Sequence, residues 1–214
     1  MKDNMTVPSK NCLFINTAEG TRALLFASGK FYYDENYKNS GSETLLPMID
    51  GLLSSAGVQL SDIDVFGACV GPGSFTGLRI GLTTVKTFCY CTGKPCFGVN
   101  NLLLNSYNSN SDKVISLADA GNRVCYVARY NGGTEEDGAR CMTTDDAKAY
   151  VAAHADYAVS TDNKLGSVFG GISGVGEKEM RTAMLAFMDR TIEQKELTPL
   201  YIRKAQPERE AGDL

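Results

Sequence analysis

The sequence predicts an α/β protein of two successive lobes, and three observations support this. The 214 residues suffice for one or two domains. With 43% hydrophobic and 21% charged residues, the composition is that of an ordinary globular chain. Short apolar strand-like runs and helical patterns follow one another twice, with strands first in each pass, so each lobe holds about 100 residues.

The first lobe is expected to span residues 11–100. Its predicted elements are strands at 11–16, 23–27 and 30–37, a helix at 44–56, a strand at 64–70, a helix at 78–92 and a strand at 94–99. Ser42 or Thr44 can cap the first helix and Gly57 can stop it. The later strand–loop–helix–strand order implies a parallel crossover.

The second lobe is expected to span residues 101–202, between a loose leader at 1–10 and a tail at 203–214. Its predicted elements are strands at 114–118 and 123–130, a helix at 144–153, a strand at 157–160 and a helix at 177–192. The polar stretch 100–112, the segment 131–138 and the glycine-rich segment 168–176 are predicted to be loops, the last one mobile. The helix at 177–192 is a candidate to pack back on the first lobe.

Composition excludes several classes of protein. No apolar run is long enough to cross a membrane, and a net charge of −4 disfavours unaided binding to nucleic acid. One histidine, His154, rules out metal sites built on several histidines. The odd number of cysteines, seven, is typical of reduced thiols in the cytoplasm. We expect no metal site, and the group Cys89, Cys91 and Cys96 is better explained by core packing.

The helix at 44–56 carries apolar residues over an arc wider than one core-facing stripe. Such a helix is either deeply buried or packs against both its own core and a partner. Gly77, Gly81 and Thr84 share one edge of the helix at 78–92, where another helix could approach closely. The predicted partner interface is Leu45, Leu46, Ile49, Leu53, Gly77, Arg79, Gly81 and Thr84. The alternative is that Gly81 faces the sheet of its own lobe.

The segment 71–81, GPGSFTGLRIG, leaves a predicted strand and opens a helix. Backbone N–H groups and a positive helix end at such a turn suit an anion or a nucleotide phosphate, with Gly71, Gly73, Ser74 and Thr76 as the candidate residues. It is not a P-loop, because Leu78 and Arg79 follow Gly77 where lysine and serine or threonine are required. The alternative is a tight turn whose glycines allow close packing.

GPGSFTGLRIG strongly resembles the signature of the TsaB (YeaZ) family of bacterial tRNA threonylcarbamoyladenosine biosynthesis proteins. Four weaker stretches agree in order: INTA at 15–18, SETLLP at 42–47, DAGNRVCY at 119–126, and PLYIR at 199–203 followed by Glu208 and Arg209. The resemblance spans residues 11–209, whereas the segment 132–176 matches little.

This resemblance implies a fold of the actin/Hsp70/sugar-kinase class with two related α/β lobes. It implies a cytoplasmic, non-catalytic subunit that pairs with TsaD and works with the small ATPase TsaE on adenosine 37 of tRNA, and that forms homodimers when TsaD is absent. ATP and metal are then expected in the partner subunits and tRNA is reached only through the complex, with no membrane involved. Nothing in these residues supports peptidase activity.

Two departures from the family pattern bear on function. Asn16 stands where the family usually has aspartate, and Asn122 replaces the arginine usual after Asp119 and Ala120. In ATP-using relatives of this fold the aspartate helps to organise magnesium, so an amide weakens the case for an ATPase. The alternative function is a free-standing nucleotide-binding phosphotransferase or ATPase of the actin-like class.

Overall fold

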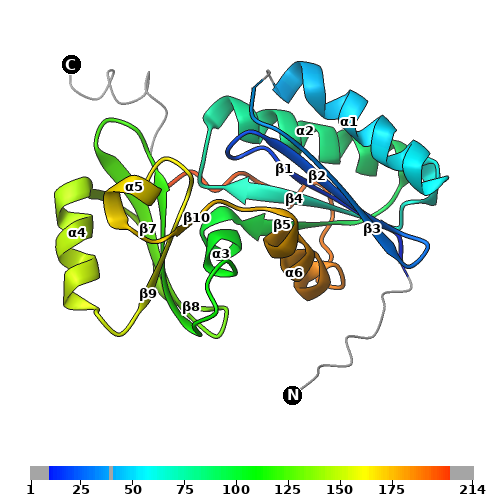
Figure 1. The fold of residues 1–214 in the computed structure, drawn as a ribbon. Coiled ribbons are helices and arrows are strands. Elements are labelled where there is room, and N and C mark those ends of the chain that lie inside the picture. The colour runs from blue at the N-terminus through cyan, green and yellow to red at the C-terminus, as the bar shows by residue number, and fades with distance from the viewer. Residues whose placement is uncertain (1–9, 39–40, 203–214) are drawn as a thin grey trace.

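The computed structural model describes residues 10–38 and 41–202, which form two five-stranded sheets (Figure 1). The first sheet has the order β3-β2-β1-β4-β5. Its strands are β1 (Cys12–Asn16), β2 (Thr21–Ala27), β3 (Lys30–Asn36), β4 (Val65–Gly71) and β5 (Cys96–Asn100). β1 runs parallel to β4, and β4 to β5, whereas β1, β2 and β3 form an antiparallel meander.

The second sheet repeats this arrangement with the order β8-β7-β6-β9-β10. Its strands are β6 (Lys113–Asp119), β7 (Val124–Asn131), β8 (Thr134–Thr143), β9 (Ala158–Thr161) and β10 (Ile172–Ser173). Again the first three strands are antiparallel, and β6, β9 and β10 are parallel. The prediction of an α/β fold with two related lobes is therefore confirmed.

Two long helices cover one face of the first sheet, and a third lies on the other face (Figure 1). α1 (Gly41–Ala56) and α2 (Phe75–Thr92) form the outer layer, and the short 3-10 helix η1 (Leu60–Asp62) follows α1. α6 (Glu177–Phe187) buries Met180 and Met184 in the same core cluster as β1, β2 and β4. The first lobe is thus completed by residues that follow the second lobe in the chain.

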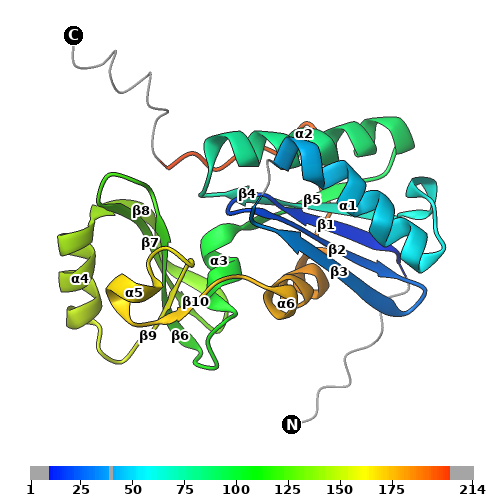
Figure 2. The same cartoon turned by 45° about the horizontal axis from the view of Figure 1, so that its top comes forward.

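The second sheet is covered by smaller helices (Figure 2). α4 (Thr144–Ala153) and α5 (Gly166–Phe169) pack on one face, over a cluster that includes Ile115, Leu117 and Val127. α3 (Asn101–Ser106) lies between the two sheets and buries Leu102 and Leu103 against the other face. α3 therefore links the lobes by packing as well as by sequence.

The structure corrects several predicted elements. The polar stretch after residue 100 begins with α3, and the stretch after residue 131 contains β8. β8 is rich in charged residues and exposed, so its strand form depends on pairing with β7 and not on its own pattern. α2 begins at Phe75 because Ser74 caps it, and α6 ends at Phe187, not at 192. The predicted mobile loop 168–176 contains β10 and the end of α5.

Residues 1–9 of the expected leader and the expected tail at 203–214 lie outside the described residues. In the described ranges, no helix combines the length and the apolar character that crossing a membrane requires.

Candidate functional site

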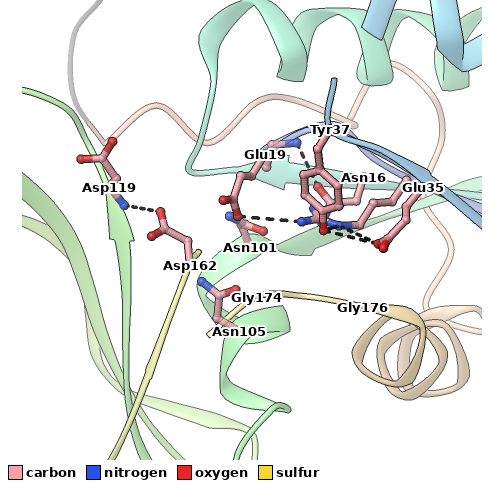
Figure 3. A network of polar contacts seen from close by, with 12 residues as sticks. Asn16, Glu19, Glu35, Tyr37, Asn101, Asn105, Asp119, Asp162, Gly174 and Gly176 are labelled. Carbon is pink, nitrogen blue, oxygen red and sulfur yellow. Dashed lines mark hydrogen bonds and ion pairs between the residues drawn. The ribbon is translucent and has the colours of Figure 1, made fainter. Parts of the chain in front are cut away.

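Polar side chains collect between the lobes, at the carboxyl ends of the parallel strands (Figure 3). Asn16 ends β1, Asn101 follows β5, and Asp119 ends β6. Asp162 follows β9, and Glu19 lies in the turn between β1 and β2. Carboxyl ends of parallel strands are where open α/β sheets bind ligands, so this interlobe site is the natural place to look for function.

On the second lobe, two aspartates hold the backbone of their own loops. Asp162 Oδ2 accepts the N–H of Asp119 at 2.6 Å, and its Oδ1 accepts the N–H of Leu165 at 3.0 Å. Asp119 accepts the N–H of Gly121 and the ammonium group of Lys164. Burial raises the pKa of Asp162, and these backbone bonds oppose the rise. Both carboxylates are engaged in shaping the strand ends.

Glu19 reaches from the first lobe toward the second. Burial, followed by the nearby charge of Asp162, raises the pKa of its carboxyl group. Arg22, the backbone N–H of Asn163 and Lys164 act in the opposite direction. Glu19 is therefore a direct polar contact between the β1–β2 turn and the loop after β9.

Arg22 is the largest fully buried side chain in the described part of the protein, with 1% of its surface exposed. Its Nε donates to Tyr37 Oη at 2.8 Å, and the Tyr37 ring lies over the guanidinium group at 4.7 Å. Nη2 lies 3.8 Å from a Glu19 oxygen and has no hydrogen-bond acceptor in the described structure. Burial of a cation with an unsatisfied donor costs free energy. A further hydrogen-bond acceptor at Nη2 would therefore stabilise this site.

The two asparagines of the first lobe have different roles. Asn16 is fully buried, its Oδ1 accepts the N–H of Ala18 at 2.9 Å, and its Nδ2 lacks a partner in the described structure. Asn101 donates from Nδ2 to the carbonyl of Pro72 at 3.0 Å. Asn101 thereby ties the start of α3 to the glycine-rich segment predicted to bind anions.

Metal ligands are not grouped in the described part of the protein. Among residues 10–38 and 41–202, no three histidine, cysteine or acidic side chains are grouped so that they could hold a metal ion. His154 lies at the end of α4, where its Nδ1 is 2.8 Å from the carbonyl oxygen of Tyr150. The arrangement is suited to holding two lobes together and to accepting a polar group between them.

The glycine-rich segment is pressed against the β1–β2 turn. Ser74 donates its N–H to the carbonyl of Ala18 at 2.9 Å and accepts the N–H of Gly77 on its Oγ. A Cβ atom on Gly73 would lie 2.7 Å from the carbonyl oxygen of Ala18. Gly71 has a φ of +106°. These contacts explain the glycines by close packing. Anion binding by Gly71, Gly73, Ser74 and Thr76 stays a prediction.

The predicted interface needs correction, because most of its residues serve the chain's own core. Leu45, Ile49 and Leu53 are 1%, 2% and 8% exposed. A Cβ on Gly77 would lie 2.1 Å from the carbonyl oxygen of Thr17, and one on Gly81 would lie 2.3 Å from Thr17 Oγ1. The small edge of α2 therefore receives the strand end of its own lobe and not an incoming helix.

The outer face of α1 and α2 carries exposed apolar side chains. Leu46 is 52% exposed and Tyr90 is 77% exposed. At the start of α2, Phe75 stacks on Tyr201 with ring centroids 5.0 Å apart, and the Arg79 guanidinium lies 3.9 Å above the Phe75 ring. Thr84, further along α2, is half-buried. Of the predicted interface, Leu46, Arg79 and Thr84 remain accessible.

Sequence reasoning missed Glu19, Arg22, Asn101 and Asp162. Asn101 and Asp162 directly follow buried strands, Glu19 lies in the turn after β1, and Arg22 is a charged residue within the buried strand β2. Their shared signal was therefore a polar residue at or near the end of a buried strand. Without the sheet order, such a residue looks like any loop residue.

Comparison with known protein families shows which family the chain belongs to. The sequence model of the family described as "TsaD: tRNA N6-adenosine threonylcarbamoyltransferase" matches residues 35–165. The protein TsaB of Haemophilus influenzae, described as a tRNA threonylcarbamoyladenosine biosynthesis protein, is 32% identical over 111 residues, covering 50% of this chain and 47% of that protein. A tRNA N6-adenosine threonylcarbamoyltransferase of Sphingopyxis alaskensis is 40% identical over 60 residues, 28% of this chain and 17% of that protein. The matches thus span less than half the length of these curated relatives.

Solved structures agree on the fold. A Pseudomonas aeruginosa protein described as similar to peptidase YeaZ superposes with a TM-score of 0.78 and 22% identity, covering 91% of this chain and all of that one. YeaZ of the same organism gives a TM-score of 0.73 with 20% identity, over 90% of this chain and 99% of that one. The fold is the two-lobed α/β fold of YeaZ. The chain belongs to the family of the TsaD model, and its similarity within that family is to TsaB/YeaZ.

Proposed function

We propose that this chain is a non-catalytic subunit of the machinery that makes N6-threonylcarbamoyladenosine at position 37 of tRNA. Its membership of the TsaD family and its similarity to a protein named for this pathway support the proposal. The subunit binds and supports TsaD, acts with TsaE, and reaches tRNA only through the complex. ATP and metal belong to the partner subunits in this proposal, and the location is the cytoplasm.

The observation that carries the proposal is the exposed apolar and aromatic surface of α1 and α2, which we call the α1–α2 strip. Leu46 on α1 and Tyr90 and Phe75 on α2 are large, apolar and exposed, and the Arg79 guanidinium lies over the Phe75 ring. Exposed apolar surface rimmed by polar residues is typical of interaction sites. In the corrected interface, the partner contacts Leu46, Arg79 and Thr84 while Leu45, Ile49 and Leu53 support them from below. A homodimer would use the same strip, so it would compete with TsaD.

The absence of catalysis is supported by the chemistry of the interlobe site. Asp119 and Asp162 already accept backbone N–H groups, and the buried position that could bear an aspartate in related enzymes is Asn16. The alternative, a free-standing nucleotide-using enzyme, requires that the purified chain alone bind and hydrolyse ATP. We expect it to do neither.

Co-expression with TsaD of the same organism, followed by size-exclusion chromatography and a threonylcarbamoyladenosine assay, tests the proposal. Leu46→Asp should abolish or strongly weaken the complex, because it places a charge in the strip. Val168→Asp is the matched control, since Val168 is also apolar and exposed but lies in the second lobe. If the wild-type chain forms no complex, or if both variants bind TsaD equally well, the proposed interface is wrong.

A further inference from the structure

A pocket of about 470 Å³ opens at the junction of the lobes, apart from both the interlobe site and the α1–α2 strip. It lies between the end of α3, the β7–β8 turn and the end of α6. We call it the α3–α6 pocket. The residues that matter most in its lining are Tyr107, Asp112, Tyr130, Gly133, Phe187 and Arg190. Its volume falls in the range of small-molecule sites.

The pocket lining includes a buried phenol that has no hydrogen-bond partner in the described structure. Tyr130 comes from β7 and is 2% exposed, and its Oη has no hydrogen-bond partner in the described structure. Burial raises the pKa of Tyr130, with smaller contributions from Glu135 and Tyr107, so the phenol keeps its proton. A buried hydroxyl left unpaired costs free energy, and a ligand acceptor in the pocket would recover it.

The pocket lining also includes a cation, Arg190. Arg190 follows α6, and its guanidinium lies over the Phe187 ring at 4.9 Å. Among the described residues, no carboxylate comes within ion-pair distance of it. Its charge lowers the pKa of Tyr107, against the rise caused by burial, which places the guanidinium near that phenol. Asp112 is the one acidic residue in the described lining, so the charge of Arg190 is available to an anion.

The remaining walls are flat. The Tyr107 and Phe187 rings line the pocket, and Gly133 lies against Tyr107, where a Cβ atom would contact the ring at 3.6 Å. The φ of +77° at Gly133 disfavours any residue with a side chain. We propose that the α3–α6 pocket binds a small organic anion with a flat ring, held by Arg190 and Tyr130 at its carboxylate or phosphate and by the aromatic walls at its ring.

Such a ligand would touch both lobes. α6 packs in the core of the first lobe, Tyr130 belongs to the second sheet and Gly133 to its β7–β8 turn, and α3 lies between the lobes (Figure 1). Binding to the folded form alone raises the thermal midpoint with ligand concentration. The ligand would therefore stabilise the junction of the lobes as well as fill the pocket.

Calorimetric titration of the whole chain tests this with three probes: adenosine 5′-monophosphate, which has a ring and an anion, adenosine, which lacks the anion, and inorganic phosphate, which lacks the ring. We expect saturable binding of the monophosphate at millimolar concentration or below. Each of the other two probes should bind at least about tenfold more weakly. Adenosine lacks the charge-assisted hydrogen bond to Arg190, and phosphate lacks the ring contact with the aromatic walls, and each of these contributes roughly that factor.

Two variants locate the binding. Arg190→Gln and Tyr130→Phe should each weaken binding of the monophosphate about tenfold. The thermal midpoint of the free protein should stay close to that of the wild type in Arg190→Gln, and it should not fall in Tyr130→Phe, because that change removes the unpaired buried hydroxyl. Arg181→Gln is the control, because it removes the same charge from α6 at a position paired with Glu177 and outside the pocket. Absence of binding, equal binding of adenosine or of phosphate alone, or binding that ignores Arg190 and Tyr130 would each overturn the proposal.

Discussion

The two lobes share one strand order but differ in the helices that cover their sheets. In the first lobe, helices of 16 and 18 residues, α1 and α2, pack on one face of the sheet, and α6 closes the other. In the second lobe, α4 has 10 residues and α5 has 4, and the last strand, β10, has 2. The same topology therefore supports a thick lobe and a thin one.

This difference in packing determines which lobe resists unfolding better. The first lobe has one continuous apolar cluster that runs from β1 through α1 and α2 to α6. The second has two smaller clusters, one on each face of its sheet. Since stability follows buried apolar area, we expect the second lobe to open first. The thick lobe can then present the outer face of α1 and α2 on a rigid support.

The largest expected effect separates the lobes directly. Leu117 is fully buried in β6, and Leu117→Ala should destabilise by about 2–5 kcal/mol. Hydrogen exchange should quicken at the amides of β6, β7 and β9 and stay slow in β1, β2 and β4. Leu24→Ala is the matched change in the first lobe, at an equally buried position in β2. If both lobes lose protection together in the Leu117 variant, they form one cooperative unit and the comparison fails.

A second prediction concerns the close approach within the first lobe. Gly77→Ala places a Cβ 2.1 Å from the carbonyl oxygen of Thr17, a backbone atom that cannot move aside by a rotamer change. We expect a loss of about 3 kcal/mol in urea unfolding. Gly51→Ala in α1 is the control, since nothing lies within 4 Å of its Cβ, and it should stabilise by about 1 kcal/mol. Equal stability of the two variants would show that α2 does not need this contact.

A third prediction addresses the contact between the lobes. The raised pKa of Glu19 means that its protonated form is favoured in the folded state. Wild-type stability contributed by this group is present below the ordinary carboxyl pKa and is lost as pH rises through the raised value. Glu19→Gln does not titrate, so its thermal midpoint relative to wild type should rise between about pH 4 and pH 7, by an amount worth at most about 1 kcal/mol. If the difference in thermal midpoint stays flat or falls with pH, the charge of Arg22 outweighs the effect of burial on the pKa of Glu19.

The smallest effect tests burial without changing the sequence. Cys91 at the end of α2 and Cys141 in β8 are exposed, whereas Cys12, Cys69, Cys89, Cys96 and Cys125 are buried. Burial also raises the pKa of Cys12, Cys69 and Cys125, which makes them poor nucleophiles. A thiol reagent should therefore modify two cysteines quickly in the native protein and the other five only on unfolding. If Cys125, the buried cysteine of the second lobe, also reacts quickly, the second lobe opens locally in the native protein.

The fold was largely predictable because the strong patterns coincide with the buried elements. β1, β2 and β4 are nearly all buried, and such strands appear in the sequence as short apolar runs. β8 was missed because an exposed edge strand with Thr, Glu and Asp at its start has no such run. α3 was missed because its six residues are too few to display a helical period.

The candidate sites were harder to predict, since they depend on which side of a helix faces the sheet. Leu45 and Leu46 are neighbours in sequence, yet one is 1% and the other 52% exposed. A wide apolar arc indicates that α1 has more apolar surface than its core-facing side can bury. The position of the sheet then decides which leucines remain exposed. In the same way, the sequence suggests that Gly81 lies on an open edge of α2, whereas in the structure Thr17 packs against it.

The return of the chain to the first lobe after β10 bears on how the protein is made. Met180, Met184 and Leu197 belong to the same core as β1 and β4, and Leu200 donates its N–H to the carbonyl of Val70. A ribosome that has released only residues 10–100 has therefore produced a sheet with one bare apolar face. The first lobe to be synthesised is the last to be completed, and until residues near 180–200 emerge, its newly made strands need a chaperone or a neighbour to cover them.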